Sequence, residues 1–551
     1  MRKFLIAIVL LMFSNIYPQQ LPTFVDYDTL DANNIWMRSS NVGTCGYAFW
    51  ELLGTDPSVV FDHGPWLTGK IGNDTIISIS QWFTSYSPGP IINGQAAMLI
   101  HPEDSLKYRV YKISKGDDST NIDYAQWPKE YGAPVDMNGN PLVLGDQTLW
   151  TVFNSLDSTM TNSVWWQEKP DPFPIEIHQT VFARNGSGND EQNIFANTVF
   201  FEWEIINKGS EQIDSAFFGF WTDIDFDPID DNRPAIDVQR QLGYCWSNKA
   251  LGWTDSIPPA VGYSLLYGPV VQSIGQTATF KGRQLANYEN LNLSSYRGIG
   301  DDSWPPPLYS PTRSLRDAWN IARGFDSQGN VIIDPTTNNP TKFPLSGDPV
   351  TGSGWIYELA TGGGAGFVFF SGPFTLSPND TQWVMIALIP AKGESNLNSI
   401  TQMRRKAEIL RSLPYDSLAF GTLSYPITDV EYEGTPAVTS FKLEQNYPNP
   451  FNPSTNIKFN IPNVETRHAS SLQMVTLKVY DVLGNEVATL VNEELSPGEY
   501  EVEFSAKGGS ASGGNAYSLS SGIYFYQLTV GGPEINSGQT MIQTKKMVLL
   551  R

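Results

Sequence analysis

Cysteine and histidine are scarce in this chain of 551 residues, which contains two cysteines and four histidines. The histidines (His63, His101, His178 and His468) are scattered, and no cysteine–histidine group has the spacing of a zinc site. The chain also lacks a Gly-x-Ser-x-Gly nucleophile motif, a His-Glu-x-x-His zinc helix and a phosphate-binding loop of the Gly-Lys-Ser/Thr type. The sequence therefore carries no signature of a serine hydrolase, a zinc protease or a nucleotide-binding enzyme.

Basic residues are few compared with acidic ones. The chain has 35 Lys and Arg against 57 Asp and Glu, which gives a formal net charge of −22. A surface this acidic repels phosphate backbones, so we expect no nucleic-acid partner. It attracts divalent cations, or it serves only to keep the protein soluble outside the cell.

Long apolar runs are absent except at the N-terminus, where residues 1–19 have the features of a secretory signal peptide. Arg2 and Lys3 precede the ten apolar residues Phe4 to Phe13, and Pro18 follows. Ten residues cover about half of a bilayer core, so the segment is predicted to be a removed leader and not a membrane span. We expect no transmembrane segment in the mature chain.

The two cysteines, Cys45 and Cys245, have two interpretations. An exported protein meets oxidising conditions, which favours a disulfide that closes a loop of 200 residues. The alternative is a pair of buried thiols that do not meet.

Aromatic residues are abundant at 13%, while charged residues make up only 17%. Few windows show helical periodicity, and strand-like runs alternate with turns, so we predict an all-β protein. A chain of this length exceeds one usual hydrophobic core. We predict a β-rich passenger domain over 20–420, a linker over 421–440 and a small immunoglobulin-like β-sandwich over 441–551. The passenger is expected to be one large sandwich or two sandwiches in tandem.

Two local patterns within the passenger are specific. Val199, Phe201, Trp203 and Ile205 alternate with Glu202 and Glu204, so 199–206 is predicted to be a strand with the apolar residues on one face and the glutamates on the other. We expect it to form a hairpin with 216–221. Around 397–412, apolar residues recur every three or four positions, which predicts one amphipathic helix that covers an edge or end of a sheet, with the basic residues Arg404, Arg405 and Lys406 on its solvated side.

The C-terminal sequence carries four recognisable segments: Gln445 to Pro453, Val479 to Val487, Ser521 to Tyr526 and the ending Lys545 to Arg551. Together they resemble the type A C-terminal sorting domain of the type IX secretion system of Gram-negative bacteria. The resemblance implies a passenger that the type IX machinery carries across the outer membrane. It also implies that the system's sortase removes the tag and attaches the passenger to surface lipopolysaccharide, so we expect a secreted protein at the outer cell surface.

The passenger itself resembles segments of large secreted proteins that carry the same tag. The matching segments are Trp127-Pro128, Gly132 to Val135, Gly145 to Trp150, Ile206 to Gly209 and Ser371 to Leu376. This second resemblance implies no particular activity.

One acidic loop directly follows the predicted strand 216–221. It contains Asp223, Asp225, Asp227, Asp230, Asp231 and Asp237. Carboxylates this dense repel one another unless a cation or many donors neutralise them, and hard oxygen ligands suit Ca²⁺. Pro228 and Pro234 stand where an EF-hand loop needs Gly and Glu, so we predict an irregular structural calcium site. The alternative is a solvated acidic turn with Arg233 as its counter-ion.

For function, we predict a non-catalytic surface sandwich that serves structure, adhesion or glycan binding. Trp165, Trp166 and Trp304 lie in loop-like sequence, where exposed rings could stack on sugars or, alternatively, anchor loops. The rival hypothesis is a secreted hydrolase of polysaccharide or peptide. A glycosidase needs only two carboxyl groups about 5–10 Å apart, and among 57 acidic residues such a pair needs no sequence motif.

Overall fold

A computed structural model describes residues 25–53, 58–80, 84–157, 172–186, 194–226, 231–248, 257–298, 316–358, 365–420, 441–461, 473–495, 498–506, 519–531 and 541–550. The chain forms two compact units, residues 1–427 and 428–551. The predicted leader and linker lie outside the described residues. Within the described residues, no helix has both the length and the apolar character needed to cross a membrane.

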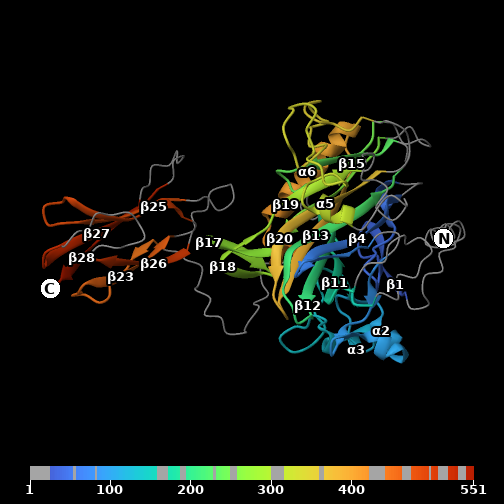
Figure 1. Cartoon of the computed structure of the whole chain (residues 1–551), viewed down its shortest axis with the longest axis horizontal. Coiled ribbons are helices and arrows are strands. Elements are labelled where there is room, and N and C mark those ends of the chain that lie inside the picture. The colour runs from blue at the N-terminus through green and yellow to red at the C-terminus, as the bar shows by residue number, and fades with distance from the viewer. Residues whose placement is uncertain are drawn as a thin grey trace, which may run out of the picture. The chain divides into compact units, whose positions relative to one another are not determined.

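The larger unit contains two extensive antiparallel sheets, which form its layers (Figure 1). The first sheet has the order β1 (Tyr27–Leu30), β2 (Ile35–Ser40), β3 (Ala48–Trp50), β4 (Ser58–Ile71), β13 (Ile213–Ile224), β20 (Ala365–Leu376) and β19 (Leu293–Gly298), with β5 (Asp74–Ser78) also pairing with β4. The second has the order β14 (Arg233–Asp237), β15 (Leu242–Trp246), β16 (Ala260–Tyr267), β21 (Thr381–Ala391), β12 (Val199–Asn207), β11 (Ile175–Ala183), β10 (Gln147–Asn154) and β6 (Ser87–Pro88), with β9 (Tyr111–Ser114) also on β10.

The two sheets share a single hydrophobic core. Trp203 of the second sheet lies against Phe218 and Phe220 of the first, with ring centroids 5.3 and 5.6 Å apart. All three side chains belong to one buried cluster that draws on both sheets. The predicted all-β class is confirmed. The passenger is one sandwich, so the alternative of two sandwiches in tandem is wrong.

The predicted hairpin between 199–206 and 216–221 is also wrong. β12 pairs with β11 and β21 in the second sheet, whereas β13 pairs with β4 and β20 in the first. The connection after Asn207 therefore carries the chain across the sandwich. The same alternation of apolar residues fits both arrangements, because each strand buries one face in the shared core.

The outer face of the second sheet is covered by two helices, α6 (Asn396–Ser412) and α7 (Tyr415–Ala419). Ile400, Met403, Ala407 and Leu410 of α6 are buried against the sheet, which confirms the predicted helix. Its basic side is not simply solvated, however, because Arg404 forms ion pairs and Lys406 donates to the carbonyl of Pro390.

Shorter elements complete the larger unit. They are the helices α2 (Ala97–Ile100), α3 (Ile122–Ala125) and α5 (Arg316–Ala322), the 3₁₀ turns η1 (Glu51–Leu53), η2 (Pro102–Tyr108) and η3 (Lys129–Tyr131), and the paired strands β7 (Ile91–Ile92) and β8 (Gln95–Ala96). A separate two-stranded hairpin, β17 (Val270–Phe280) with β18 (Arg283–Asn290), stands out from the large sheets (Figure 1).

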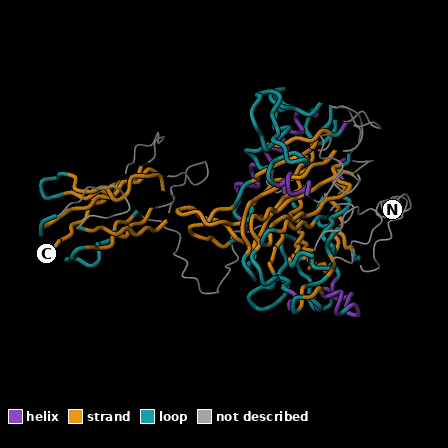
Figure 2. Tube along the Cα trace, in the orientation of Figure 1, coloured by secondary structure: helices purple, strands orange, loops and turns teal. Residues whose placement is uncertain are grey.

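The smaller unit is a β-sandwich with its own core (Figure 2). One sheet has the order β22 (Lys442–Leu443), β23 (Ser454–Ile461) and β26 (Gly498–Ser505), and the other has the order β25 (Glu486–Leu495), β24 (Gln473–Tyr480), β27 (Gly522–Gly531) and β28 (Met541–Leu549). Ile457 and Phe459 of one sheet and Val475 and Leu477 of the other are fully buried in one cluster. The predicted small sandwich is confirmed.

Candidate functional site

The most unusual chemistry of the larger unit is a buried charged cluster on the outer face of the second sheet. His178 of β11 lies between two glutamates, with Nε2 3.0 Å from Glu176 Oε1 and Nδ1 3.3 Å from Glu204 Oε2. Glu204 also binds Lys281 Nζ at 2.5 Å. Glu176 further accepts a hydrogen bond from the Ile91 amide at 2.6 Å. These four side chains form one continuous network across β11, β12 and the turn of the β17–β18 hairpin.

The network shifts the pKa of each of its acids and of its histidine. Burial lowers the pKa of His178, but hydrogen bonds to Glu176 and Glu204 outweigh burial and leave it raised. Burial raises the pKa of Glu204, but Lys281 and His178 outweigh it and lower the pKa to about 2. For Glu176, the His178 hydrogen bond and charge likewise overcome burial and lower the pKa. The arrangement is a cationic histidine held between two carboxylates.

The pKa of Glu202, two residues before Glu204 on β12, is shifted in the opposite direction and is raised. Glu202 is 1% exposed, and neither carboxylate oxygen has a hydrogen bond of regular geometry. Burial raises its pKa, although the charge of Lys281 and hydrogen bonds from the Tyr415 hydroxyl and the Trp383 indole lower it in part. Two neighbouring carboxyl groups are thus driven apart in pKa, which is how acid and base roles are separated at catalytic sites.

A small cavity of about 90 Å³ lies beside this pair of glutamates. It is lined by Pro134, Leu142, Leu144, Thr180, Lys281, Tyr415 and Phe420. Thr180 lies directly opposite Glu202 across β11 and β12. Sites for small-molecule ligands usually enclose about 300–1,000 Å³. This cavity is well below that range and has room for only a few water molecules.

Of the six aspartates predicted to bind calcium, four lie within the described residues. Asp231 is fully buried and accepts hydrogen bonds from Arg233 at 3.0 Å, the Ser247 hydroxyl at 2.8 Å and the Asn248 amide at 2.6 Å. Protein donors therefore satisfy this carboxylate, and Arg233 is one of them, although Asp231 is buried and not in a solvated turn.

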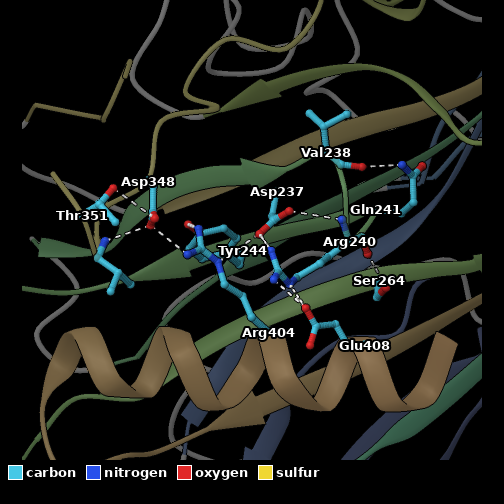
Figure 3. Close-up of polar contacts among 11 residues, drawn as sticks. Asp237, Val238, Arg240, Gln241, Tyr244, Ser264, Asp348, Thr351, Arg404 and Glu408 are labelled. Carbon is cyan, nitrogen blue, oxygen red and sulfur yellow. Dashed lines mark hydrogen bonds and ion pairs between the residues drawn. The ribbon is translucent and has the colours of Figure 1, made fainter. Parts of the chain in front are cut away.

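Asp237 lies in a second, separate network that binds α6 to the sheet (Figure 3). Its carboxylate is 2.9 Å from Arg240 and 3.0 Å from Arg404, and Arg404 also reaches Asp348 at 2.8 Å. Arg240 in turn pairs with Glu408 of α6. Asp237 thus helps to hold α6 against the sheet through its ion pair with Arg404.

Asp223 and Asp225 stand at the end of β13, and Asp223 is directly opposite Asp62 of β4. Asp62 was not predicted from the sequence. It is 7% exposed, and burial raises its pKa to about 8. Asp227 and Asp230 lie outside the described residues. Among the described part of the chain, no three potential ligands are grouped so as to hold a metal ion, and calcium binding stays a prediction.

Cys45 and Cys245 are both buried as free thiols, so the structure does not contain the candidate disulfide. The Cys45 sulfur lies 3.5 Å from the Gln179 amide of β11, whereas Cys245 is on β15. Four strand spacings of about 4.8 Å separate β11 from β15 in the second sheet. Between them, buried His63 contacts the Tyr263 hydroxyl at 2.6 Å within the core.

Tryptophan side chains in the described residues are buried or half-buried. Trp66, Trp150, Trp203, Trp221 and Trp383 are among the largest fully buried side chains. The predicted sugar-stacking candidates Trp165, Trp166 and Trp304 lie outside the described residues.

Sequence reasoning missed the buried cluster of glutamates and His178. The only available signal was alternation, which places Glu176 and His178 on one face of β11 and Glu202 and Glu204 on one face of β12. The antiparallel register brings Glu204 opposite His178, and that register is not visible in the sequence.

A protein-family comparison decides the nature of the smaller unit. The family described as secretion system C-terminal sorting domain matches residues 445–548. The C-terminal unit is a type IX sorting domain. The type IX machinery therefore exports this protein to the outer surface of a Gram-negative bacterium.

No curated protein matches the chain. Among solved structures, a polysaccharide lyase is similar over 96% of this chain and 46% of its own length, with 7% identity and a TM-score of 0.25. This chain thus spans less than half of that protein. The adhesin domain of Epf from Streptococcus pyogenes is similar over 70% of this chain and 94% of its own, with 8% identity and a TM-score of 0.13. Likenesses this weak bear on neither fold nor function.

Proposed function

We propose that the larger unit is a non-catalytic β-sandwich displayed at the cell surface, where it serves adhesion through glycan binding. One observation carries this proposal: the two sheets enclose one shared core, and further buried clusters on their outer faces take up most of the large tryptophan side chains. The charged groups that could do chemistry are buried beside a cavity of about 90 Å³. A closed, rigid body that a sorting domain carries to the surface suits display better than turnover of a polymer.

Two partners follow from the sorting domain. We propose that the system's sortase removes the sorting domain and that the larger unit is then attached to surface lipopolysaccharide. The predicted linker, 421–440, lies between the described parts of the two units in the sequence, where cleavage would release intact domains.

The rival function, a secreted hydrolase, is favoured by one observation. Glu202 and Glu204 are neighbouring carboxyl groups with opposite pKa shifts, and alternate residues of a strand lie roughly 7 Å apart, a spacing that suits inverting glycosidases. Their burial opposes this function, since Glu202 is 1% exposed. Loss of a measured hydrolytic activity in both Glu202→Gln and Glu204→Gln would establish the hydrolase.

We also propose that calcium stiffens the end of β13, with Asp223 and Asp225 as ligands and with Asp227 and Asp230 contributing from the following loop. The position of Asp62 opposite Asp223 supports this proposal, because it brings a third carboxyl group to the end of β13. Isothermal titration should detect calcium binding in the full-length chain and a smaller heat in Asp223→Asn. An unchanged melting temperature on addition of EGTA would refute it.

The display function is tested by a glycan array together with an activity screen of the purified full-length chain on polysaccharides and proteins. We expect binding to one class of glycan and no turnover. Turnover of any polymer with loss of activity in Glu204→Gln would overturn the proposal.

A further inference from the structure

One half of the outer face of the first sheet carries a row of aromatic rings. Trp36 of β2 lies directly opposite Phe49 of β3, with ring centroids 6.1 Å apart. Tyr47, just before β3, continues the row, with its ring centroid 6.4 Å from that of Phe49 and 5.1 Å from that of Phe61 of β4. We call these four residues the aromatic strip.

Alternation along the strands turns the aromatic strip away from the core. The neighbours of Trp36 in β2, Ile35 and Met37, are buried in the core that the two large sheets share, and so are both neighbours of Phe49 in β3. Trp36 and Phe49 therefore point to the opposite face of the sheet. All four rings of the strip are half-buried, and none of them belongs to a buried hydrophobic cluster of the described residues.

The other half of this outer face is covered by α5. Trp66 of β4 and Trp221 of β13 are buried there in one cluster with Trp319 and Ile321 of the helix. The same face of the sheet thus buries its rings where the described chain supplies a cover and leaves them half-exposed at the aromatic strip. An apolar surface that the chain itself leaves uncovered indicates an interaction site.

The backbone of Tyr47 is held in an unfavourable conformation that keeps its ring in the row. Its φ is 54°, in the left-handed region that bulky residues rarely adopt. The Tyr47 amide donates to the Phe61 carbonyl at 2.9 Å, and its carbonyl accepts from the Arg38 amide at 3.3 Å. The Tyr47 and Phe49 rings lie within 8° of parallel. Backbone strain of this kind gathers at functional sites, which supports a ligand-binding role for the aromatic strip.

Polar groups lie beside the rings. Arg38 follows Trp36 by two positions in β2 and so shares its face, and the Arg38 guanidinium lies 4.4 Å from the ring centroid of Tyr27. Within the described part of the chain, Arg38 forms no ion pair and the Tyr47 hydroxyl forms no hydrogen bond. A guanidinium offers five N–H donors, and a tyrosine hydroxyl both donates and accepts. Aromatic faces next to free donors and acceptors suit a ligand that has both apolar faces and hydroxyl groups, as sugar rings do.

A second copy of the chain and an acidic polymer fit the aromatic strip less well. Aromatic side chains have areas of about 150–250 Å², so four half-buried rings expose at most about 300 Å². Each partner in a stable protein complex usually buries about 800 Å². The chain also has a net charge of −22, which repels a second copy and a polyanion alike, and Arg38 is the one basic residue of β1, β2 and β3.

We propose that the aromatic strip binds an uncharged polysaccharide chain. Successive sugar rings lie on Trp36, Phe49 and Tyr47, and their hydroxyl groups bind the Arg38 guanidinium and the Tyr47 hydroxyl. The spacing of the rings, 5.1–6.4 Å, is close to the length of one sugar residue in a chain. This inference rests on the proposed glycan-binding function and gives it a location.

The aromatic strip is tested by affinity electrophoresis of the full-length chain in native gels that contain dextran, laminarin, galactomannan or the acidic polymer alginate. The variants are Trp36→Thr, Phe49→Thr and Arg38→Met, and the control is Tyr288→Thr, an aromatic residue on β18 that is 41% exposed and outside the strip. We expect at least one uncharged polysaccharide, and not alginate, to retard the wild type and the control. Each strip variant should bind about tenfold more weakly, as expected when one well-packed contact is lost.

Threonine keeps the strand propensity of both positions, and Arg38→Met leaves the rings in place, so the test holds even if one variant fails to fold. Glycan-array binding that the folded variants leave unchanged would overturn the aromatic strip as the site while leaving the proposed function intact. Retardation by alginate alone would overturn the uncharged class of ligand. A wild-type dimer in sedimentation that Trp36→Thr dissociates would overturn the proposal in favour of a second copy. No binding in any gel or on the array would overturn both the strip and the proposed function.

Discussion

Replacing His178 by leucine tests whether the buried charged cluster is as tightly built as the distances indicate. The change removes the cation between Glu176 and Glu204 and leaves both carboxylates facing each other, with Lys281 and Lys208 as the remaining nearby cations. Breaking a buried ion pair by removing one partner usually costs about 3–5 kcal/mol. A unit of about 400 residues has an unfolding entropy of roughly 0.8 kcal/mol/K, so we expect its melting temperature to fall by about 4–6 °C.

The loss of thermal stability in His178→Leu should depend on pH in a defined direction. Because the pKa of His178 is raised in the folded protein, its contribution to stability is complete below its unfolded pKa of 6.5 and disappears as pH rises through the folded value. The lowered pKa values of Glu176 and Glu204 act in the opposite direction, since their contribution is lost as pH falls below about 4.5. The difference between wild type and His178→Leu should therefore be largest near pH 5–6 and shrink toward pH 9.

Differential scanning calorimetry of the full-length chain at pH 5.5, 7 and 9 measures this effect on the transition of the larger unit. His101→Leu is the matched control, because His101 also pairs with a glutamate but its side chain is 47% exposed. We expect the control to change the melting temperature by less than about 1 °C. The reasoning would be refuted if His178→Leu had the same melting temperature as the wild type at pH 5.5. It would also be refuted if the difference in melting temperature did not shrink with rising pH.

Three further changes have defined outcomes. Arg404→Met should cost about 2–3 kcal/mol in thermal denaturation, because it removes an ion pair with Asp237 and a charged hydrogen bond to Asp348, and an unchanged melting temperature would contradict these contacts. Gly132→Ala should lower the free energy of unfolding by about 1–3 kcal/mol, because Gly132 has φ +91° and an added Cβ would clash with the His178 ring. Equal stability of the variant and the wild type would contradict this close approach. Burial raises the pKa of the Cys45 thiol to about 12 and also raises that of Cys245, so neither cysteine should react with iodoacetamide until urea unfolds the chain. Fewer than two reactive thiols after unfolding would contradict free cysteines.

The strands and the covering helix were accessible to sequence reasoning because each pattern repeats within one element. The alternation over 199–206 identified β12, and the three-to-four spacing over 397–412 identified α6. The pairing of strands was not accessible in the same way. Alternation shows that a face of β12 is buried but not which strand lies beside it, so the hairpin with 216–221 was predicted where the chain crosses to the other sheet.

The candidate site depended on contacts that are distant in sequence. Alternation places Glu202 and Glu204 on one face of β12 but does not show what covers that face, and Lys281, Trp383 and Tyr415 cover it from positions about 80–210 residues later. The six aspartates between Asp223 and Asp237 led instead to the prediction of a calcium site. A high local density of charge identifies an acidic loop, whereas a network of side chains from β11, β12 and the β17–β18 turn can be identified only when the strand register is known.

Export of the protein with and without residues 441–551 tests the account most directly. In a type IX-competent strain, whole-cell labelling and fractionation should find the intact protein at the outer surface, with the sorting domain removed. The protein lacking 441–551 should remain inside the outer membrane with the larger unit folded. Surface display of the truncated protein, or retention of the intact one by a working type IX system, would contradict the account.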